Sequence, residues 1–287
     1  MSKTWEQIES DFQSKLAAIY PQEEIQQLFH ITLEDLVHIN KHQYIDFRDK
    51  ELTADQLIQF QDILVQLASG RPIQHITGQA FFYKSFFRVS EHTLIPRPET
   101  EELVHMIIQD LKNKKNKHII DIGTGSGCIP ISIASQLPQH NYWALDISNE
   151  ALKIAQYNAV KHKIAIQFIN ADILEWEYLF QEDILFDVIV SNPPYITPKE
   201  KKEMHSNVLN FEPHLALFIE EDAPLLFYDY ISSFAQKHLR KGGFLYFEIN
   251  QYLGSETVTL LQKKGFANVQ LFKDINGADR MIRAKWL

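Results

Sequence analysis

The chain has 287 residues, of which 45% are hydrophobic and 23% charged, and its net charge is −9. This composition is typical of one large or two smaller globular domains, and no apolar run is long enough to span a membrane. The acidic balance disfavours direct binding of nucleic acid through its phosphates. The single cysteine, Cys128, excludes an intramolecular disulfide, and the N-terminal residues lack the apolar core of a signal peptide, so we expect a cytoplasmic protein. No Cys/His cluster suggests a metal site, and we expect none.

Residues 1–75 are predicted to form a small helical domain. Apolar residues recur at spacings of three and four within residues 4–20, which places one side of a helix in a core. Residues 53–70 repeat this pattern. Thr53 is a suitable N-cap for this second predicted helix, which ends at Gly70. Two shorter helices are expected between them.

Residues 76–95 are predicted to be a β-hairpin that links this domain to a second one. They are rich in aromatic and β-branched residues on both sides of Lys84 and Ser85. A helical pattern returns after Pro98, so the second domain is expected to cover residues 96–287.

The second domain alternates strand-like and helical segments. Such alternation, with almost continuously apolar strands, predicts an α/β fold whose mostly parallel sheet is covered on both faces. Two last strand-like runs flank Asn276-Gly277, a strong turn dipeptide, and predict a terminal antiparallel hairpin. The earlier strand-like runs are residues 118–121, 142–146, 165–170, 186–190 and 243–249.

A glycine-rich loop follows the first of these strands. Ligands of open parallel sheets bind outside the carboxyl ends of the strands, and glycines let the backbone approach them closely. The spacing G-x-G-x-G differs from the dinucleotide pattern because Cys128 replaces the third glycine, and no G-K-[ST] follows, which excludes a P-loop. Taken alone, the loop could be no more than a tight turn. Its residues are Asp121, Gly123, Thr124, Gly125, Ser126 and Gly127.

Polar residues also follow the next three strands. Asp146 could accept hydrogen bonds from both hydroxyls of a ribose, or could merely precede a helix capped by Ser148. Asp172 could accept from an adenine amino group, or could belong to an ordinary polar loop. After the fourth strand comes Asn-Pro-Pro-Tyr, residues 192–195. Polar signatures at four successive strand ends indicate one ligand site rather than four coincidences.

Together, residues 121–127, Asp146, Asp172 and residues 192–195 resemble the class I S-adenosylmethionine-dependent methyltransferases that methylate a planar nitrogen. The resemblance implies a doubly wound, mostly parallel seven-stranded sheet with a terminal antiparallel hairpin. It implies S-adenosyl-L-methionine as cofactor and S-adenosyl-L-homocysteine as product. The glycine loop would support the methionyl and ribose parts, Asp146 would hold the ribose, and Asp172 with Ile173 would border the adenine.

The Asn-Pro-Pro-Tyr turn suits methylation of an NH₂ group. The Asn192 side-chain oxygen, which also borders the cofactor, can accept one N–H and the Pro193 carbonyl the other, and both then stabilise positive charge that develops on nitrogen. Pro193 and Pro194 stiffen the turn, and Tyr195 is expected to stack on the planar substrate. Neither a metal nor a general base is needed before attack.

Two further segments resemble the release factor glutamine methyltransferases: residues 78–104 and residues 211–218. That family methylates N5 of the glutamine in the Gly-Gly-Gln loop of peptide-chain release factors, and residues 1–75 would then dock the release factor. Glutamine methyltransferases of ribosomal proteins share Asn-Pro-Pro-Tyr but have Arg-Ser-Pro where this chain has Arg97-Pro98-Glu99-Thr100-Glu101. They remain an alternative, as do adenine-N6 methyltransferases of DNA or RNA and a non-catalytic binding module. We expect a monomer that binds neither membranes nor nucleic acid directly.

Overall fold

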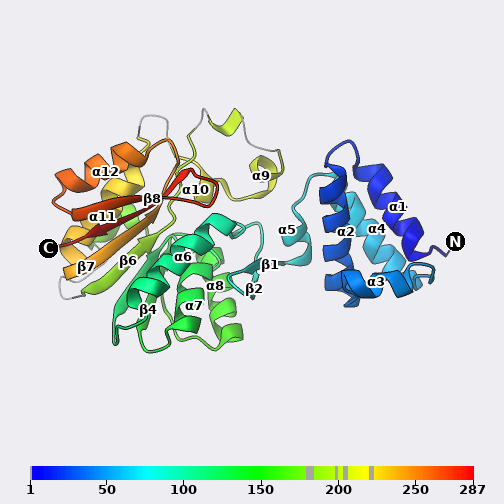
Figure 1. Ribbon diagram of the computed structural model, residues 1–287, viewed down its shortest axis with the longest axis horizontal. Coiled ribbons are helices and arrows are strands. Elements are labelled where there is room, and N and C mark those ends of the chain that lie inside the picture. The colour runs from blue at the N-terminus through cyan, green and yellow to red at the C-terminus, as the bar shows by residue number, and fades with distance from the viewer. Residues whose placement is uncertain (1, 179–183, 198–199, 203–205, 220–222) are drawn as a thin grey trace. The chain divides into compact units, whose positions relative to one another are not determined.

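The computed structural model describes residues 2–178, 184–197, 200–202, 206–219 and 223–287 (Figure 1). The chain divides into two compact units. One consists of Met1–Gly78 with His205–Phe211, and the other of Gln79–Met204 with Glu212–Leu287. In the described part of the chain, no helix has both the length and the apolar character that a membrane span requires.

The first unit is helical, as predicted. Trp5, Phe12, Phe29 and Phe60 meet mostly edge-on in its core, a geometry that aromatic rings favour. Thr53 begins the fourth helix with a capping box, which confirms the predicted cap. The helices are α1 (Trp5–Leu16), α2 (Gln22–Val37), α3 (Lys41–Phe47), α4 (Ala54–Ala68), α5 (Ile73–Thr77) and α9 (Ser206–Phe211).

Helix α9 belongs to this unit although it lies far from the other helices in the sequence. Asn207 donates from Nδ2 to the Tyr20 hydroxyl at 3.0 Å, and Tyr20 in turn donates to the Leu67 carbonyl oxygen. The helical pattern of the N-terminal residues could not reveal this packing, because it depends on one polar contact between distant parts of the chain.

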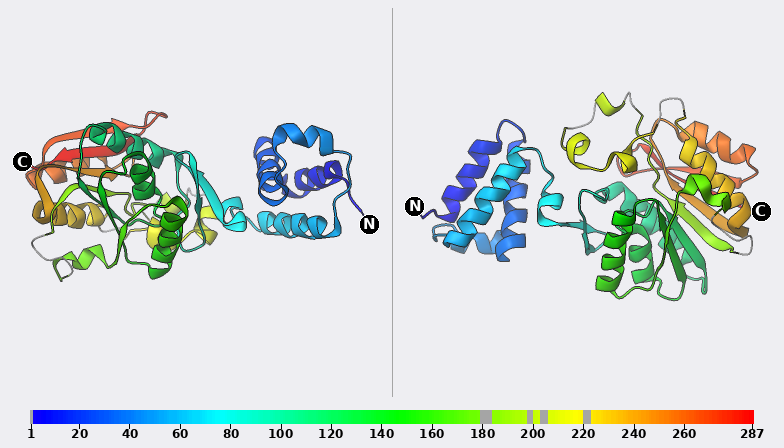
Figure 2. Two further views of the ribbon diagram at one scale, coloured as in Figure 1. Left: turned by 90° about the horizontal axis from the view of Figure 1, so that it is seen from below. Right: turned by 180° about the vertical axis from the view of Figure 1, so that it is seen from behind.

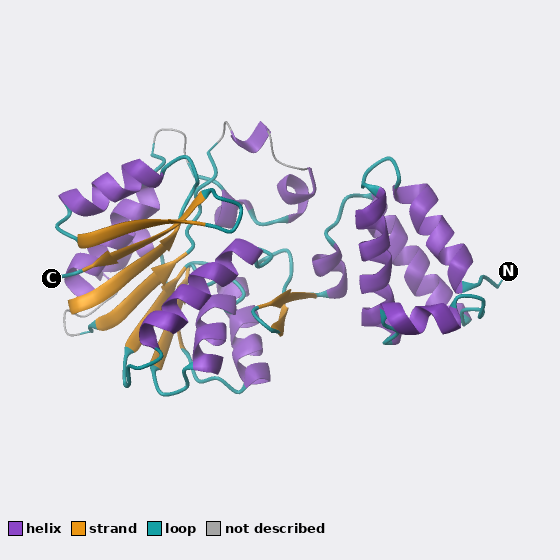
Figure 3. Ribbon diagram, viewed as in Figure 1, coloured by secondary structure: helices purple, strands orange, loops and turns teal. Residues whose placement is uncertain are grey.

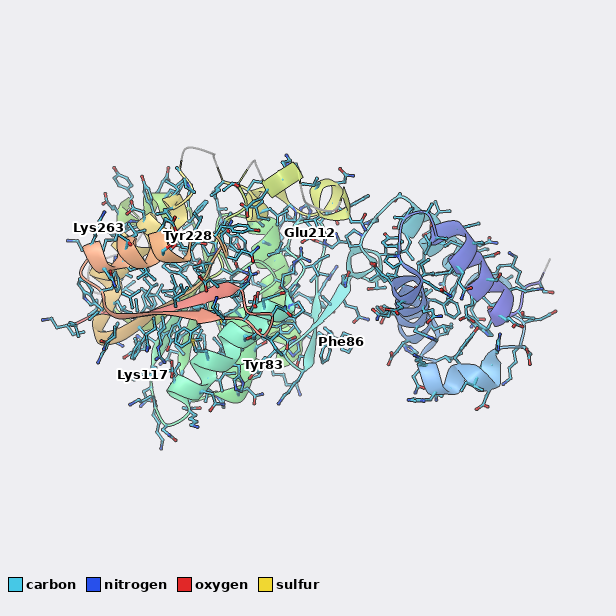
Figure 4. All side chains as sticks on the ribbon, turned by 45° about the horizontal axis from the view of Figure 1, so that its top comes forward. Tyr83, Phe86, Lys117, Glu212, Tyr228 and Lys263 are labelled. Atoms are coloured by element: carbon cyan, nitrogen blue, oxygen red, sulfur yellow. The ribbon has the colours of Figure 1, made fainter. Side chains whose placement is uncertain are left out.

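A two-stranded hairpin begins the second unit. Strands β1 (Gln79–Phe82) and β2 (Ser85–Arg88) pair Phe82 with Ser85, so the turn is Tyr83-Lys84, one residue earlier than the predicted centre. Both turn residues have positive φ, 41° and 69°, as a tight type I′ turn requires. The shift lets Phe82 and Phe87 point into the core, while Phe86 is half-exposed on the other face (Figure 4).

A seven-stranded sheet forms the centre of the second unit, in the order β5-β4-β3-β6-β7-β9-β8 (Figure 3). The first five strands in this order are parallel, and β9 is antiparallel to both of its neighbours, β7 and β8, with Asn276-Gly277 in the turn between β8 and β9. This confirms the predicted fold class and its terminal hairpin. The strands are β3 (His118–Ile122), β4 (Asn141–Asp146), β5 (Gln167–Asn170), β6 (Phe186–Ser191), β7 (Leu239–Glu248), β8 (Ala267–Lys273) and β9 (Asp279–Lys285).

Helices cover both faces of the sheet (Figure 2). Successive residues of a strand face opposite sides, so Ile119 packs with α6, α7 and α8, and Ile120 packs with α11 and α12. The helices of this unit are α6 (Pro98–Leu111), α7 (Cys128–Gln136), α8 (Asn149–His162), α10 (His214–Leu217), α11 (Leu226–His238) and α12 (Gly254–Lys263), with 3₁₀ turns at Ile173–Tyr178 and Glu200–Lys202.

The strand order fixes where a ligand can bind. The chain proceeds from β3 outwards to β5 and then returns to the other side of β3 with β6, so the direction of winding reverses between β3 and β6. A crevice opens at the carboxyl ends of strands at such a point. Ile122 pairs with Ser191 there, which brings the glycine loop beside Asn192.

Candidate active site

A cavity of about 250 Å³ lies at these strand ends. It collects residues that follow β3, β4, β5 and β6, as the sequence predicted for a single ligand site. The predicted residues in its wall are Gly123, Gly125, Asp146, Asp172, Ile173, Asn192, Pro193 and Pro194. Five predicted residues do not line the cavity, although the structure describes them. They are Asp121, Thr124, Ser126, Gly127 and Tyr195.

The glycine loop crosses from β3 to α7 in a conformation that only glycine adopts easily. Gly125 and Gly127 have φ values of 54° and 78°. A Cβ on Gly127 would lie 3.1 Å from the Cβ of Ala155 in α8, so this glycine also permits close packing of the two helices. The Gly125 N–H donates to Oδ2 of Asp146 at 2.8 Å, which ties the loop to the end of β4.

Asp146 is held from both sides. Its Oδ1 accepts from the Ser148 N–H at 2.9 Å, while Oδ2 accepts from Gly125. Each carboxylate oxygen has a second lone pair that these bonds leave available. Burial raises the pKa of Asp146, and the backbone hydrogen bonds act against that rise. Asp146 is therefore a fixed acceptor in the cavity wall.

Asp121 is a buried carboxyl group beneath the glycine loop. It is fully buried, and neither of its oxygens has a hydrogen-bond partner among the described residues. Thr124 Oγ1 and Ser126 Oγ are buried and unpartnered in the same part of the chain. Burial raises the pKa of Asp121 to about 7; the nearby Thr124 hydroxyl acts against that rise, and the charge of Asp146 adds to it.

This raised pKa predicts that the wild-type protein is less stable at about pH 8 than at about pH 5. Between its unfolded pKa near 3.8 and its folded pKa near 7, Asp121 binds more protons in the folded state. Unfolding free energy therefore falls as the pH rises through that window and levels off above it. Denaturant unfolding of wild type and Asp121→Asn at both pH values measures the effect. The variant should lose this component of the pH dependence, and an equal dependence in both proteins would contradict the prediction.

The Asn-Pro-Pro-Tyr turn leaves β6 beside the cavity. Asn192 donates from Nδ2 to Oγ1 of Thr100 at 3.4 Å. The Tyr195 hydroxyl donates to Oε1 of Glu248 at 3.3 Å, and the Tyr195 carbonyl oxygen accepts from Nδ2 of Asn250. The Tyr195 ring therefore points to the end of β7, and its stacking on a substrate stays a prediction.

Two other segments also line the cavity, as do Phe227 and Ile231 of α11, and they were given no role from the sequence. The first is residues 92–94, and the second contributes Pro213, Leu215 and Ala216. Glu212 joins them, because its buried carboxylate accepts from Arg97 Nη2 at 2.6 Å and from the Ile95 N–H (Figure 4). Both segments lie within the stretches that were identified by resemblance alone, residues 78–104 and 211–218.

Known proteins resemble this chain over nearly its whole length. Residues 101–211 match the model of the methyltransferase small domain, and residues 10–78 match that of the PrmC N-terminal domain. The release factor glutamine methyltransferase of Flavobacterium psychrophilum is 49% identical over 96% of this chain and 97% of its own. That of Bacteroides thetaiotaomicron is 40% identical over 94% and 95%.

A solved structure agrees in fold. The 16S rRNA N2 G1207 methyltransferase of T. thermophilus superposes with a TM-score of 0.52 at 18% identity, over 73% of this chain and 50% of that one. The identity of the sequence relatives over nearly their full length, together with both domain models, goes beyond fold. The chain belongs to the family of release factor glutamine methyltransferases.

Proposed function

We propose that the protein transfers a methyl group from S-adenosyl-L-methionine to N5 of the glutamine in the Gly-Gly-Gln motif of peptide-chain release factors, leaving S-adenosyl-L-homocysteine. One observation carries the proposal. The acceptors of the Asn-Pro-Pro-Tyr turn, Asn192 and Pro193, share a cavity wall with Asp146 and Asp172. Residues that would hold a nucleoside thus line the same cavity as residues that would hold an NH₂ group.

The residues around the cavity suit this cofactor. Asp146 would accept from the ribose hydroxyls with the lone pairs left by Gly125 and Ser148. Asp172 and Ile173 would border the adenine, and the glycine loop would support the methionyl part. When bound, S-adenosylmethionine supplies a sulfonium methyl that is already electrophilic.

The chain's task is then to orient the glutamine amide. Its lone pair is delocalised, so holding the nitrogen in line with the methyl group is the main contribution of the protein. The Asn192 side-chain oxygen and the Pro193 carbonyl would each accept one N–H, and Pro194 would keep the turn rigid. The product proton can leave afterwards, so the reaction requires no general base and no metal.

The helical unit offers a surface for docking the release factor. A glutamine at a loop tip provides little contact area, so affinity has to come from contacts elsewhere. Ile58 and Val65 lie two turns apart on α4, and each is about two-thirds exposed, at 64% and 65%. We propose that these two exposed side chains form part of the docking surface.

We expect the double variant Ile58→Glu, Val65→Glu to raise KM for intact release factor by about tenfold. Turnover of a short Gly-Gly-Gln peptide should not change, because the peptide lacks the parts of the release factor that would contact α4. Steady-state kinetics with both substrates measure the difference. Val160→Glu is the matched control, since Val160 is 79% exposed on α8 of the other unit. An unchanged KM in the double variant would place docking elsewhere.

Labelled S-adenosylmethionine tests the proposed function directly. Label should enter purified release factor and should be lost when the loop glutamine is replaced by alanine. Parallel reactions with ribosomal proteins, DNA and RNA test the alternatives, and label in one of these alone would overturn the proposal. Because the substrate acts in translation, we propose that the protein works in the cytoplasm, as a monomer and without direct contact with nucleic acid.

A further inference from the structure

We propose that Thr100 and Glu248 are positioning residues that fix the side-chain amide of Asn192 with its oxygen towards the substrate. The catalytic consequence rests on the proposed function, whereas the orientation itself does not. Neither residue lines the cavity, and both are almost completely buried, at 3% and 1% exposed.

Three hydrogen bonds form the chain of contacts behind Asn192. Asn192 donates from Nδ2 to Thr100 Oγ1 at 3.4 Å, and Thr100 donates from that hydroxyl to Glu248 Oε2 at 2.6 Å. The other oxygen of Glu248 accepts from the Tyr195 hydroxyl at 3.3 Å. A single buried carboxylate is thus linked to both polar side chains of the Asn-Pro-Pro-Tyr turn.

The orientation of an asparagine amide has to be fixed by its neighbours, because its oxygen and its NH₂ group have almost the same shape. A half-turn about the last side-chain bond exchanges the acceptor oxygen for the NH₂ group. Only one orientation can accept a hydrogen bond from a substrate NH₂. In the other orientation, donor faces donor, and the substrate nitrogen loses the acceptor that stabilises its developing charge.

Thr100 can select the orientation because its hydroxyl has only one proton. The short bond to a carboxylate is charge-assisted and commits that proton to Glu248. Thr100 Oγ1 can then only accept a hydrogen bond from Asn192. The Nδ2 atom of Asn192 therefore has to face Thr100, and its Oδ1 atom has to face away. The 3.4 Å distance is long for a hydrogen bond, so the orientation follows mainly from which group can donate and which can accept.

Glu248 completes the selection because an ionised carboxylate accepts and never donates. Burial raises its pKa, while the hydrogen bond from Thr100, the charge of Arg280 and the Tyr195 hydroxyl act in the opposite direction, and Glu99 adds to the rise. If Glu248 carried the proton instead, the Thr100 hydroxyl would be free to donate to Asn192 and to favour the flipped amide.

The first test compares Thr100→Val with Thr100→Ser. Valine keeps the shape of threonine but removes the hydroxyl, and we expect kcat to fall by about 10-fold to 100-fold. KM for release factor and Kd for S-adenosylmethionine should stay near wild type, and serine should restore kcat. Near-normal kcat in Thr100→Val would overturn the proposal. So would an equal loss in Thr100→Ser, because the hydroxyl would then not be the feature that matters.

A double-mutant cycle separates positioning from general stability. If Thr100 acts only through Asn192, then Thr100→Val should cause no further loss in an Asn192→Ala background. Independent, additive losses would overturn the proposal.

Glu248→Gln serves as a second variant. A glutamine side chain can either donate to or accept from the Thr100 hydroxyl, so it permits both orientations of the Asn192 amide. It should lower kcat less than Thr100→Val does, and full activity would contradict the assignment.

An NMR measurement tests the orientation without any substrate. The Asn192 side-chain NH₂ signals, identified by their loss in Asn192→Ala, should exchange slowly with water in wild type and in Thr100→Ser. They should exchange rapidly in Thr100→Val, and equal rates in all three proteins would overturn the proposal. If wild type failed to methylate release factor, this result would still stand, so the two proposals can fail separately.

Discussion

Replacement of Asn192 by alanine is expected to lower kcat for release factor methylation by about 10²-fold to 10³-fold, the usual effect of removing one preorganised group that stabilises transition-state charge. The variant removes an acceptor that lies in the cavity wall beside Pro193. Kd for S-adenosylmethionine should change much less, because Asp146 and the glycine loop remain intact. Single-turnover kinetics, together with calorimetric titration of the cofactor, separate the two effects.

Asn141→Ala is a suitable control for this experiment. Asn141 is an exposed asparagine at the start of β4, the end of the strand opposite to the cavity. Its replacement should leave both kcat and cofactor affinity at wild-type values. Near-normal turnover in Asn192→Ala would show that the Pro193 carbonyl alone orients the amide, and the role assigned to the side chain would be wrong.

The sheet could be predicted from the sequence because each strand carries its own local signal. The apolar runs at β3, β4 and β6 are short and bounded by glycine, aspartate or proline, and alternation with helices implies parallel strands. Once the strands are parallel, the residues that follow them must meet at one edge. The convergence of Gly123, Asp146, Asp172 and Asn192 on one cavity is therefore a consequence of topology.

Contacts between distant residues could not be predicted in this way. Thr100 and Glu248 are 148 positions apart, and nothing in either local sequence indicates that a hydroxyl will meet a carboxylate. The same is true of the Arg97–Glu212 ion pair, which joins two walls of the cavity. For Tyr195 the motif predicts an aromatic ring near the substrate, but the direction of the ring depends on Glu248 and Asn250.

The second large effect is expected for cofactor binding. Asp146→Ala should raise Kd for S-adenosylmethionine by about 10²-fold to 10⁴-fold, since each hydrogen bond to a charged acceptor contributes about 1.5 to 3 kcal/mol and two ribose hydroxyls lose theirs. The glycine loop loses an anchor as well, because Gly125 no longer has its acceptor. Isothermal titration measures the affinity.

Asp187→Ala is the matched control for loss of a carboxylate from the same sheet. Asp187 lies at the opposite end of β6, where it accepts from Lys117, Arg240 and the His118 N–H. Its replacement should lower stability without changing Kd for the cofactor. If Asp187→Ala weakened binding as much as Asp146→Ala does, the effect would reflect the fold and not the ribose.

A cofactor analogue separates the lost ribose contact from a displaced loop. S-adenosylmethionine without its ribose 2′-hydroxyl should bind wild type more weakly than the natural cofactor does, because Asp146 then has one donor fewer. In Asp146→Ala the two compounds should bind equally, since the acceptor for that hydroxyl is gone. If the analogue were penalised equally in both proteins, another group would hold the ribose. Asp146 would then serve only to anchor the loop through Gly125 and Ser148.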